Sequence, residues 1–466
     1  MKQLSGLDNV FLQAESARTP MHITAVMIYD RSTAPPGTLS FDGVFSHFET
    51  NLKKSPIFRR KLLRTPFGAD KPYWIEDKDF DLKSHVFHEA LPKPGNWQQL
   101  CSLIANLHGQ ALNLKRPLWE AHVVGGLNNI EGVPDGSFAI ILKVHHAAID
   151  GVSAAEIINA LHSFRQDETP DNSDDDWQPE RVPGAMDLMW RSYMNGFMRS
   201  TELAETLGKF IPAVRQANKR SDKKTEFAQK FKTRFNRRVS GHLVSDALRM
   251  EFEQVREIKN HVQGTTINDV VVSIVGGGLR RYLVAKDELP EESMVAGAPI
   301  NTRDIAGTES TGNSISMMRI PLRTDIADPL ERLNAVRSGA IKSKTYAKAI
   351  GVRSMTDIAN SLSPGWLALG LRAVTAEGLS ERIPTPLHTM VSNVPGPPVD
   401  LYLRGARLHD ILGFGPLVDQ AGLFHAVTSI GGSMAISFTC CRNMLPDPAF
   451  YRQCLQDSFE ELRAAV

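Results

Sequence analysis

The sequence predicts an α/β protein made of two domains with a long connector between them. Its 466 residues exceed the roughly 100–200 residues of a typical domain. Apolar, β-branched segments at Met21–Tyr29 and Phe138–Val144 predict buried strands, while Trp97–Leu112 and Pro448–Ala464 have helical patterns. The composition shifts abruptly to charged residues between these two groups of elements. We therefore expect an N-terminal domain, a connector and a C-terminal domain, at residues 1–165, 166–239 and 240–466.

The predicted connector is acidic where it starts and basic where it ends. Six acidic residues fall within Asp167–Asp176, a composition typical of a solvated linker. The segment Met186–Phe210 is helical in pattern and rich in methionine, and Arg215–Arg238 then carries ten basic residues against two acidic ones. The basic stretch fits a solvated connector and equally a surface that docks on anionic lipid, where each basic residue contributes about 1 kcal/mol. The helix before it suits a lipid interface or packing across both domains.

Composition and charge argue against several classes of protein. The formal net charge of +1 creates no field that would gather nucleic acid, so we expect no nucleic-acid partner. No uncharged apolar stretch approaches the roughly 20 residues of a membrane span, and the N-terminus lacks the apolar core of a signal peptide. The four cysteines form no C-x-x-C pair and are expected to be buried thiols in a reducing compartment. The expected location is the cytoplasm.

Two adjacent histidines mark the segment that carries chemistry. The predicted strand Phe138–Val144 runs into His145 and His146, and Asp150 and Gly151 follow after a short loop. Successive side chains of a strand point to opposite faces, so the two imidazoles cannot both aim at one point, which argues against a metal site on the pair. We expect one histidine to face the reacting groups and the other to be held in the structure. The aspartate is close enough to fix the loop or an imidazole, and the glycine permits a backbone conformation that other residues resist.

Capping patterns and glycines add predictions about two helices. An S-x-x-E capping box predicts that the helix after the histidine motif begins at Ser153. Thr266 is predicted to cap a second helix, with Asp269 favoured by the helix dipole in its first turn beside Asn268. Gly276–Gly278 lie inside that second helix, where glycine is unfavourable. Three together predict a close backbone approach, either to another helix or to a bound ligand.

The histidine segment resembles the H-H-x-x-x-D-G motif of the CoA-dependent acyltransferase superfamily. The rest of the chain is similar to the bacterial wax ester synthase/diacylglycerol acyltransferase family, through elements that occur in order over nearly its whole length. One small departure is Asn113, which precedes the P-L-W element where the family often has aspartate. The matching elements are Leu4-Ser5-Gly6-Leu7-Asp8, Pro20-Met21-His22, Arg116-Pro117-Leu118-Trp119-Glu120, Ile267-Asn268-Asp269-Val270-Val271, Gly277–Leu283, Gly312-Asn313 and Ser392-Asn393-Val394-Pro395-Gly396-Pro397.

This resemblance implies both a fold and a reaction. The implied fold is two chloramphenicol-acetyltransferase-like domains, with mixed sheets flanked by helices and the active site in a tunnel between them. The implied reaction moves a long-chain fatty acyl group from acyl-CoA to a long-chain alcohol, forming a wax ester, and to diacylglycerol, forming triacylglycerol. No cofactor is implied, because acyl-CoA is a substrate. Attachment to the inner membrane or to lipid inclusions as a peripheral protein is also expected.

Two alternative functions compete with this reaction. The first is an acyltransferase of the same superfamily that acts on a polar alcohol or an amine, and the ordered family elements argue against it. The second is a non-catalytic lipid-droplet binding protein that uses the basic connector, and the intact histidine motif argues against it. His146→Ala would distinguish acyl transfer from the second alternative, because in an acyltransferase it should abolish product formation without changing lipid binding.

The resemblance also suggests roles for individual residues. It implies that His146 is the general base, which physical chemistry supports because imidazole is poised to exchange a proton near neutral pH. Asn268 is a candidate hydrogen-bond donor to the developing oxyanion, and the motif aspartate is expected to pair with an arginine. The predicted catalytic set is His146, His145, Asp150 and Asn268. Residues expected to support the site are Gly151, Arg303 (the candidate partner of Asp150) and Asp269. Candidates for substrate contact are Trp119, Ser392 and Asn393.

Overall fold

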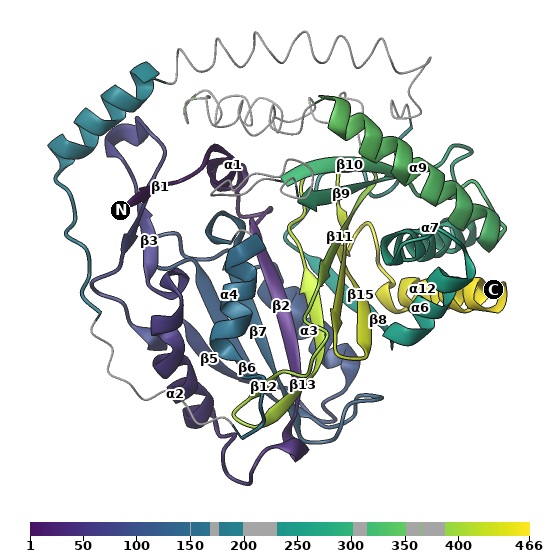
Figure 1. Cartoon of the computed structure of the whole chain (residues 1–466), viewed down its shortest axis with the longest axis horizontal. Coiled ribbons are helices and arrows are strands. Elements are labelled where there is room, and N and C mark those ends of the chain that lie inside the picture. Colours follow the sequence, from purple (N-terminus) through teal and green to yellow (C-terminus); the bar gives the residue numbers. More distant parts are fainter. Residues whose placement is uncertain (150, 168–176, 199–230, 302–314, 351–364, 366–386) are drawn as a thin grey trace.

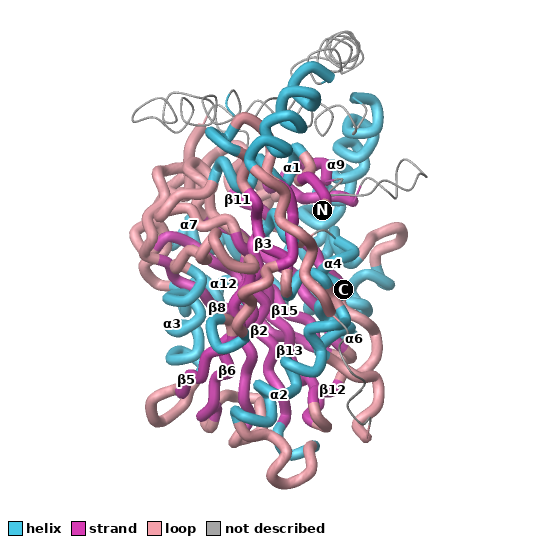
Figure 2. Tube along the Cα trace, turned by 90° about the vertical axis from the view of Figure 1, so that its left-hand side faces the viewer, coloured by secondary structure: helices cyan, strands magenta, loops and turns pink. Residues whose placement is uncertain are grey.

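The structure is a computed structural model of the whole chain. It describes all residues except 150, 168–176, 199–230, 302–314, 351–364 and 366–386. Two halves lie side by side, each built on a six-stranded sheet with helices packed against it (Figure 1). Seen from the side, the strands run through the middle of the molecule and helices lie outside them (Figure 2). The predicted α/β class is therefore confirmed.

The first sheet has the strand order β12-β13-β2-β7-β6-β5. Its neighbouring strands are antiparallel except β5 and β6, which are parallel. The strands predicted at Met21–Tyr29 and Phe138–Val144 are confirmed as β2 and β7, each with ends that differ by one residue. In sheet order, the strands span Tyr402–Leu403, Ala406–Phe414, His22–Asp30, Ser137–His145, Trp119–Leu127 and Val86–Ala90.

Helices cover both faces of this sheet, so every residue of β7 is buried. Phe138 and Ile140 of β7 pack in a core with α2 and α4, while Ala139 and Ile141 pack in a second core with α3. The helix predicted at Trp97–Leu112 is α3, which ends four residues earlier. The helices of this half are α1 (Gly6–Ala14), α2 (Phe41–Asn51), α3 (Trp97–His108) and α4 (Gly151–Leu161).

The prediction that α4 begins at Ser153 is wrong. The helix begins two residues earlier, at Gly151, which is also the last residue of the histidine motif. The S-x-x-E pattern therefore lies inside the helix and does not form its N-terminal cap.

A small outer sheet completes the first half, with the order β1-β4-β3. Its strands are β1 (Lys2–Gln3), β4 (Tyr73–Glu76) and β3 (Arg60–Leu63). Short 3-10 turns connect the larger elements: η1 (Arg31–Thr33), η2 (Leu52–Lys54), η3 (Pro56–Phe58), η4 (Pro66–Gly68), η5 (Leu82–Ser84) and η6 (His146–Ala148).

The second large sheet has the order β10-β9-β11-β14-β15-β8. It is mixed, because β11 is parallel to both of its neighbours while the other pairs are antiparallel. The strands, in sheet order, are Ile315–Pro321, Val295–Asn301, Thr389–Pro395, Leu423–Ile430, Ser433–Cys441 and Leu243–Glu251. The helices are α6 (Phe252–His261), α7 (Ile267–Ala285), α9 (Pro329–Ile350) and α12 (Pro448–Ala464).

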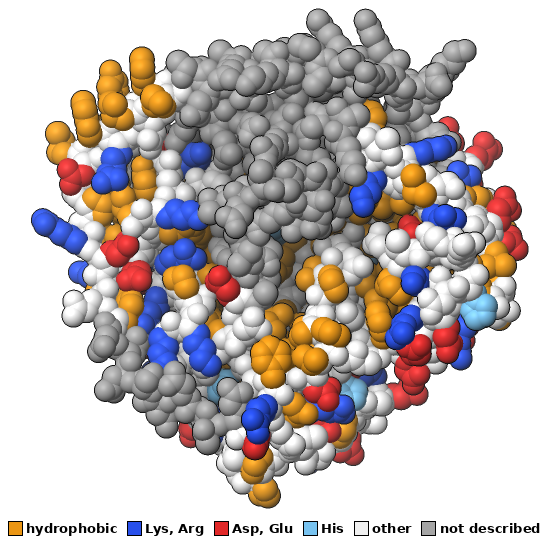
Figure 3. Space-filling model, in the orientation of Figure 1, with side chains coloured by type: hydrophobic (Ala, Val, Ile, Leu, Met, Phe, Trp, Pro, Cys, Tyr) orange, Lys and Arg blue, Asp and Glu red, His pale blue; other side chains and the backbone are white. Residues whose placement is uncertain are grey.

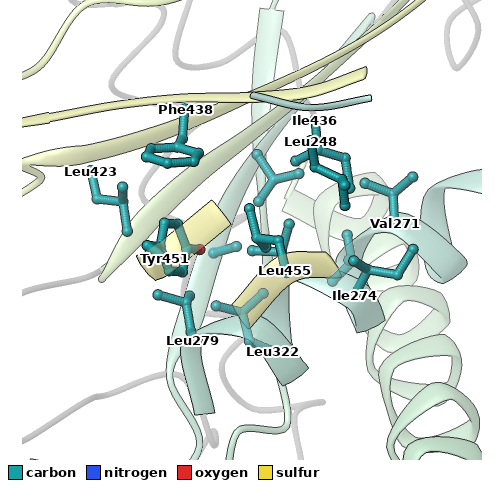
Figure 4. Close-up of a cluster of buried hydrophobic side chains, with 14 of the residues drawn as sticks. Leu248, Val271, Ile274, Leu279, Leu322, Leu423, Ile436, Phe438, Tyr451 and Leu455 are labelled. Carbon is teal, nitrogen blue, oxygen red and sulfur yellow. The ribbon is translucent and has the colours of Figure 1, made fainter. Parts of the chain in front are cut away.

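The core of the second half lies between this sheet and the pair α7 and α12. Leu248 and Ile436 of the sheet point toward Leu455 of α12 and Ile274 of α7 (Figure 4). The glycines of α7 allow the helix to approach its neighbours. A Cβ on Gly278 would lie 2.6 Å from the Leu455 side chain, so the predicted close approach to another helix is confirmed.

Strand β13 connects the two halves. This strand comes from the C-terminal part of the chain, yet it pairs with β2 of the first sheet over Thr24–Asp30, and the two lie side by side in Figure 1. Contacts of β13 with β14 and β15 link it to the second sheet as well. The two sheets therefore meet along β13, which also forms part of the wall of the cavity described below. The domain boundaries at residues 165 and 239 stay predictions.

Part of the predicted connector is described. A helix at 185–198, the teal helix at the upper left of Figure 1, matches the first half of the segment Met186–Phe210. The rest of that segment, and most of the basic stretch, lie outside the described residues. The helix packs on the small sheet, because Nδ2 of Asn195 donates to Asp70 Oδ2 at 2.7 Å and to the Tyr73 hydroxyl at 3.0 Å.

Candidate active site

The histidine motif lies where β7 ends and the chain turns toward α4. His145 is the last residue of β7, and His146 begins the 3-10 turn η6. The backbone N–H of His146 donates to the carbonyl of Met21 at 2.8 Å, which ties the turn to the start of β2. Gly151 is the first residue of α4, and Asp150 lies outside the described residues.

His145 is held on both sides of its ring. Its side chain is fully buried, and its Nδ1 accepts a hydrogen bond from the backbone N–H of Ala147 at 3.0 Å. Its Nε2 lies 3.3 Å from the Oε2 atom of Glu15, which is the C-terminal capping residue of α1. This environment fixes the imidazole and, through Ala147, the shape of the turn.

His146 has a different environment. Its ring stacks on Phe11 of α1, with centroids 3.8 Å apart and planes 16° apart. Its Nδ1 is buried and has no hydrogen-bond partner among the described residues. Burial lowers the pKa of His146 to about 4; its own backbone carbonyl opposes this shift and nearby His145 adds to it. The imidazole is therefore neutral at pH 7 and has a lone pair with which to accept a proton.

An apolar cavity of about 140 Å³ lies between the two large sheets, beside the motif. Val144, two residues before His146, and Ile149, three residues after it, both line its wall. This volume is below the roughly 300–1,000 Å³ of typical ligand pockets, so it suits a stretch of hydrocarbon chain. The lining residues are Ile23, Thr24, Ala25, Met27, Leu142, Val144, Ile149, Ile157, Ile158, Leu161, Ser392, Val394, Ile411, Leu412, Gly413, Phe414, Gly415, Phe424, Ala426 and Thr428.

A buried polar cluster lies on the opposite face of the same strands. His22 pairs in register with His145 and meets the ring of His108 edge-on at 5.0 Å. Burial, followed by the charges of neighbouring groups, lowers the pKa of His22 well below its usual value. Lys143 donates to the carbonyl of Gln110 at 2.8 Å and lies 3.2 Å from a carboxylate oxygen of Glu120. The charge of this lysine is therefore matched inside the sheet.

Asn268 and Asp269 lie in the first turn of α7. The predicted cap is confirmed: Thr266 and Asp269 form a capping box, in which each side chain bonds the other residue's backbone N–H. Asn268 is half-buried, and no hydrogen bond or ring contact between described residues links it to His146. Arg303 lies outside the described residues.

The three candidates for substrate contact occupy different positions. Ser392 lines the apolar cavity from β11, whereas Asn393 is half-buried and is not among the lining residues. Trp119 is a core residue, 1% exposed, whose indole N–H donates to the Phe58 carbonyl at 2.9 Å. The structure therefore gives Trp119 a packing role and places it away from the cavity wall.

Two residues that contact the motif were not predicted from the sequence. Phe11 and Glu15 lie one turn apart at α1, more than 120 residues before the histidines. The one available signal was their spacing of four, which places both on the same helix face. Within the described residues, no group of three or more His, Cys, Asp or Glu side chains is arranged to hold a metal ion.

The sequence matches two family models that together cover most of the chain. The wax ester synthase/diacylglycerol acyltransferase catalytic domain matches residues 4–271, and the C-terminal domain of the same family matches residues 311–463. A protein of Mycobacterium tuberculosis named putative diacylglycerol O-acyltransferase is 31% identical over 463 residues, covering 96% of this chain and 87% of that protein.

Solved structures give the same picture. The wax ester synthase/diacylglycerol acyltransferase from Marinobacter aquaeolei VT8 is similar with a TM-score of 0.70 and 25% identity, covering 100% of this chain and 99% of that one. The trichothecene 15-O-acetyltransferase of Fusarium sporotrichioides has a TM-score of 0.58 at 12% identity, covering 99% and 95% of the two chains. The second likeness concerns the fold alone.

Proposed function

The chain belongs to the wax ester synthase/diacylglycerol acyltransferase family, and from that premise we propose that it transfers a fatty acyl group from acyl-CoA to the hydroxyl of a long-chain alcohol or of diacylglycerol. The observation that carries this proposal is the neutral imidazole of His146 beside an apolar cavity between the two sheets. A base and a hydrocarbon-binding space are the two things the reaction needs.

In the proposed mechanism His146 acts on the acceptor alcohol. An alcohol is a weak nucleophile until its proton has an acceptor. The imidazole takes that proton as the oxygen attacks the thioester carbonyl, and the C–S bond of acyl-CoA then breaks. The proton passes to the departing sulfur, which yields an ester and free CoA. A thiol leaves readily, so direct transfer needs no acyl-enzyme.

The low pKa of His146 has two opposite consequences for this step. It keeps the imidazole unprotonated and ready at neutral pH. It also makes the imidazole a weaker base, because the positive charge that it gains is costly in a buried place. Proton transfer therefore requires groups that stabilise the imidazolium as it forms. We propose that Asn268 donates a hydrogen bond to the oxyanion, because it is half-buried in the first turn of α7.

The apolar cavity is proposed to hold a hydrocarbon chain of the substrates. Its wall is almost entirely aliphatic or aromatic, with side chains of α4, β2, β7 and β13. Transfer of a CH₂ group from water into such a place contributes about 0.8 kcal/mol. The hydroxyl of Ser392 is among the few polar groups on this wall, and we assign it contact with the substrate near its polar end.

We also propose that the protein works at a lipid surface. Helix 185–198 carries exposed Met186, Trp190, Tyr193 and Phe197, which are 66–79% exposed, and apolar side chains crowd the same corner in Figure 3. Phe67, in the turn η4 that connects β3 and β4 of the small sheet, is 99% exposed. Large apolar side chains presented together are typical of interfacial binding. None of the described helices is long and apolar enough to span a membrane.

Cosedimentation with phospholipid vesicles tests the lipid-surface proposal. Replacing Trp190 and Phe197 by serine is expected to reduce the bound fraction severalfold, whereas replacing exposed Val284 of α7 by serine leaves it unchanged. Equal binding by both variants would contradict the proposal.

Free thiol release from palmitoyl-CoA tests the acyl-transfer function. The wild-type protein is expected to release CoA in a manner that depends on a long-chain alcohol or diacylglycerol. His146→Ala should lower that rate by roughly 10²–10⁴-fold. Release that requires a polar alcohol or amine, with none for lipid acceptors, would overturn the proposed substrate class.

A further inference from the structure

Helix α1 contacts both histidines of the motif. Phe11 lies against the ring of His146, and one turn later Glu15 places a carboxylate oxygen 3.3 Å from Nε2 of His145. Residues four apart share one face of a helix, so a single face of α1 meets two consecutive residues of the motif. The cap formed by Ser5, whose hydroxyl accepts from the N–H of Asp8, defines where this helix begins.

Hydrogen bonding defines the tautomer of His145. Because the backbone N–H of Ala147 donates to Nδ1 at 3.0 Å, that nitrogen carries the lone pair. The N–H of the ring is then on Nε2, which is the atom that faces Glu15. A continuous path of contacts thus runs from the carboxylate through the His145 ring to the turn that carries His146.

The carboxylate of Glu15 is unfavourable for stability in this place. Its side chain is 7% exposed, and neither oxygen has a hydrogen-bond partner among the described residues. Its contact with His145 has the distance of an ion pair without the alignment of a direct hydrogen bond. A buried acceptor without partners costs free energy. Such a local cost is expected where function requires the group.

The other polar groups near the motif do not offer an equivalent charge. On α1, Asp8 is engaged with the Ser5 hydroxyl at 2.6 Å. On β2, burial holds the pKa of His22 well below its usual value, so this residue is neutral. On β7, the ammonium of Lys143 is matched by Glu120. Among the described residues on α1, β2 and β7, Glu15 is the acidic group that contacts a motif histidine.

We propose that Glu15 is a positioning residue that supplies, through His145, the counter-charge for proton transfer to His146. This inference rests on the acyl-transfer function proposed above. When the alcohol O–H bond breaks and its proton binds His146, the carboxylate stabilises the new positive charge across the His145 ring. The proton later leaves for the CoA sulfur, and no proton is transferred to Glu15 in either step.

Glu15→Gln tests the proposal, because glutamine keeps the size of the side chain and removes its charge. We would measure kcat and KM with a long-chain alcohol and with an alcohol of equal length that is fluorinated beside the hydroxyl-bearing carbon. The fluorinated alcohol is more acidic and depends less on the base. The expected result is a kcat about 10-fold lower with the ordinary alcohol, unchanged KM values, and a smaller loss with the fluorinated alcohol.

Two further variants separate this role from simple stability. Glu15→Asp keeps the charge and should retain more of the wild-type kcat than Glu15→Gln. Asp447→Asn removes a carboxylate that pairs with Lys286 in the other half of the molecule, and it should leave kcat unchanged. If Glu15→Gln does not fold, Glu15→Asp decides: its loss of kcat should be larger with the ordinary alcohol than with the fluorinated one.

Two results would overturn the inference. In the first, Glu15→Gln has the kcat of the wild type. In the second, the variant that folds loses the same fraction of kcat with both alcohols. A wild-type protein without acceptor-dependent thiol release would instead remove the proposed function itself. The two failures are therefore distinguishable, because the first requires an active wild-type enzyme.

Discussion

The ring of Phe11 lies flat against the ring of His146, with centroids 3.8 Å apart. This stack joins the first helix of the chain to the residue proposed as its base. The Nδ1 atom of His146 has no hydrogen-bond partner among the described residues. The stack on Phe11 is therefore the contact that orients the ring. The orientation of the base thus depends on a helix that contributes no residue to the H-H-x-x-x-D-G motif.

Replacing Phe11 by leucine is expected to lower kcat up to about 10-fold, because an aromatic stack worth roughly 0.5–1.5 kcal/mol is lost. Thiol release from acyl-CoA measures the effect. Phe41→Leu is a matched control, since Phe41 stacks on His88 at 4.6 Å and 13° without touching the motif. Equal losses of kcat in both variants would show that the stack on His146 has no special role.

The two histidines should differ in how much they stabilise the fold. His145→Ala removes the acceptor of the Ala147 N–H in a buried place, which costs about 1–3 kcal/mol. His146→Ala removes a half-buried ring with no hydrogen bond to Nδ1 and is expected to cost less. Urea unfolding of both variants measures the free energies. A larger loss in His146→Ala would contradict the different environments assigned to them.

The sequence predicted the strands because they depend on local geometry: apolar, β-branched runs specify β2 and β7. Alternation along a strand does not separate the two histidines, because His146 begins the turn η6 and both rings contact residues on one face of α1. The contacts of Phe11 and Glu15 with the motif could not be predicted, since they depend on how α1 packs on residues far along the chain. The pairing of β13 with β2 is non-local for the same reason.

The start of α4 and the position of Trp119 show that a sequence motif does not by itself define the structural role of its residues. A capping pattern at Ser153 is a weak signal when the chain can enter the helix earlier, and the helix begins at Gly151. Trp119 belongs to a recognisable P-L-W element, but its indole packs between Phe48, Phe58 and His85 in the core. Sequence motifs located these residues without distinguishing packing from substrate contact.

Narrowing the cavity should change the preferred acyl chain length. Ala25 of β2 lies on the cavity wall, and Ala25→Leu would fill part of the roughly 140 Å³. Each buried CH₂ of the substrate contributes about 0.8 kcal/mol, so losing the space of two such groups should lower kcat/KM for palmitoyl-CoA by about 10-fold. Octanoyl-CoA, assayed with the same variant, is the control and should be affected less. An equal loss for both chain lengths would place the acyl chain elsewhere.

Stability should fall as pH decreases from about 6.5 to about 4, because of buried histidines. Burial lowers the pKa of His108, His162, His388 and His425 to about 4 in each case, below the value of about 6.5 in an unfolded chain. Above pH 6.5 both states are neutral, so these groups add no pH dependence. Between pH 6.5 and 4 the unfolded chain binds protons that the folded chain does not, which favours unfolding.

His425→Gln isolates one of these contributions. The ring of His425 lies 2.7 Å from the Tyr451 hydroxyl and 3.0 Å from the Thr389 hydroxyl, and glutamine offers polar groups that do not titrate. The difference between a pKa of about 4 in the folded chain and about 6.5 in the unfolded chain lowers the free energy of unfolding by about 2–3 kcal/mol between pH 7 and 4.5. Urea unfolding at both pH values should therefore show that the variant loses less stability than the wild type on acidification. Equal losses in the two proteins would mean that His425 titrates similarly whether the chain is folded or unfolded, and burial would then not control its charge.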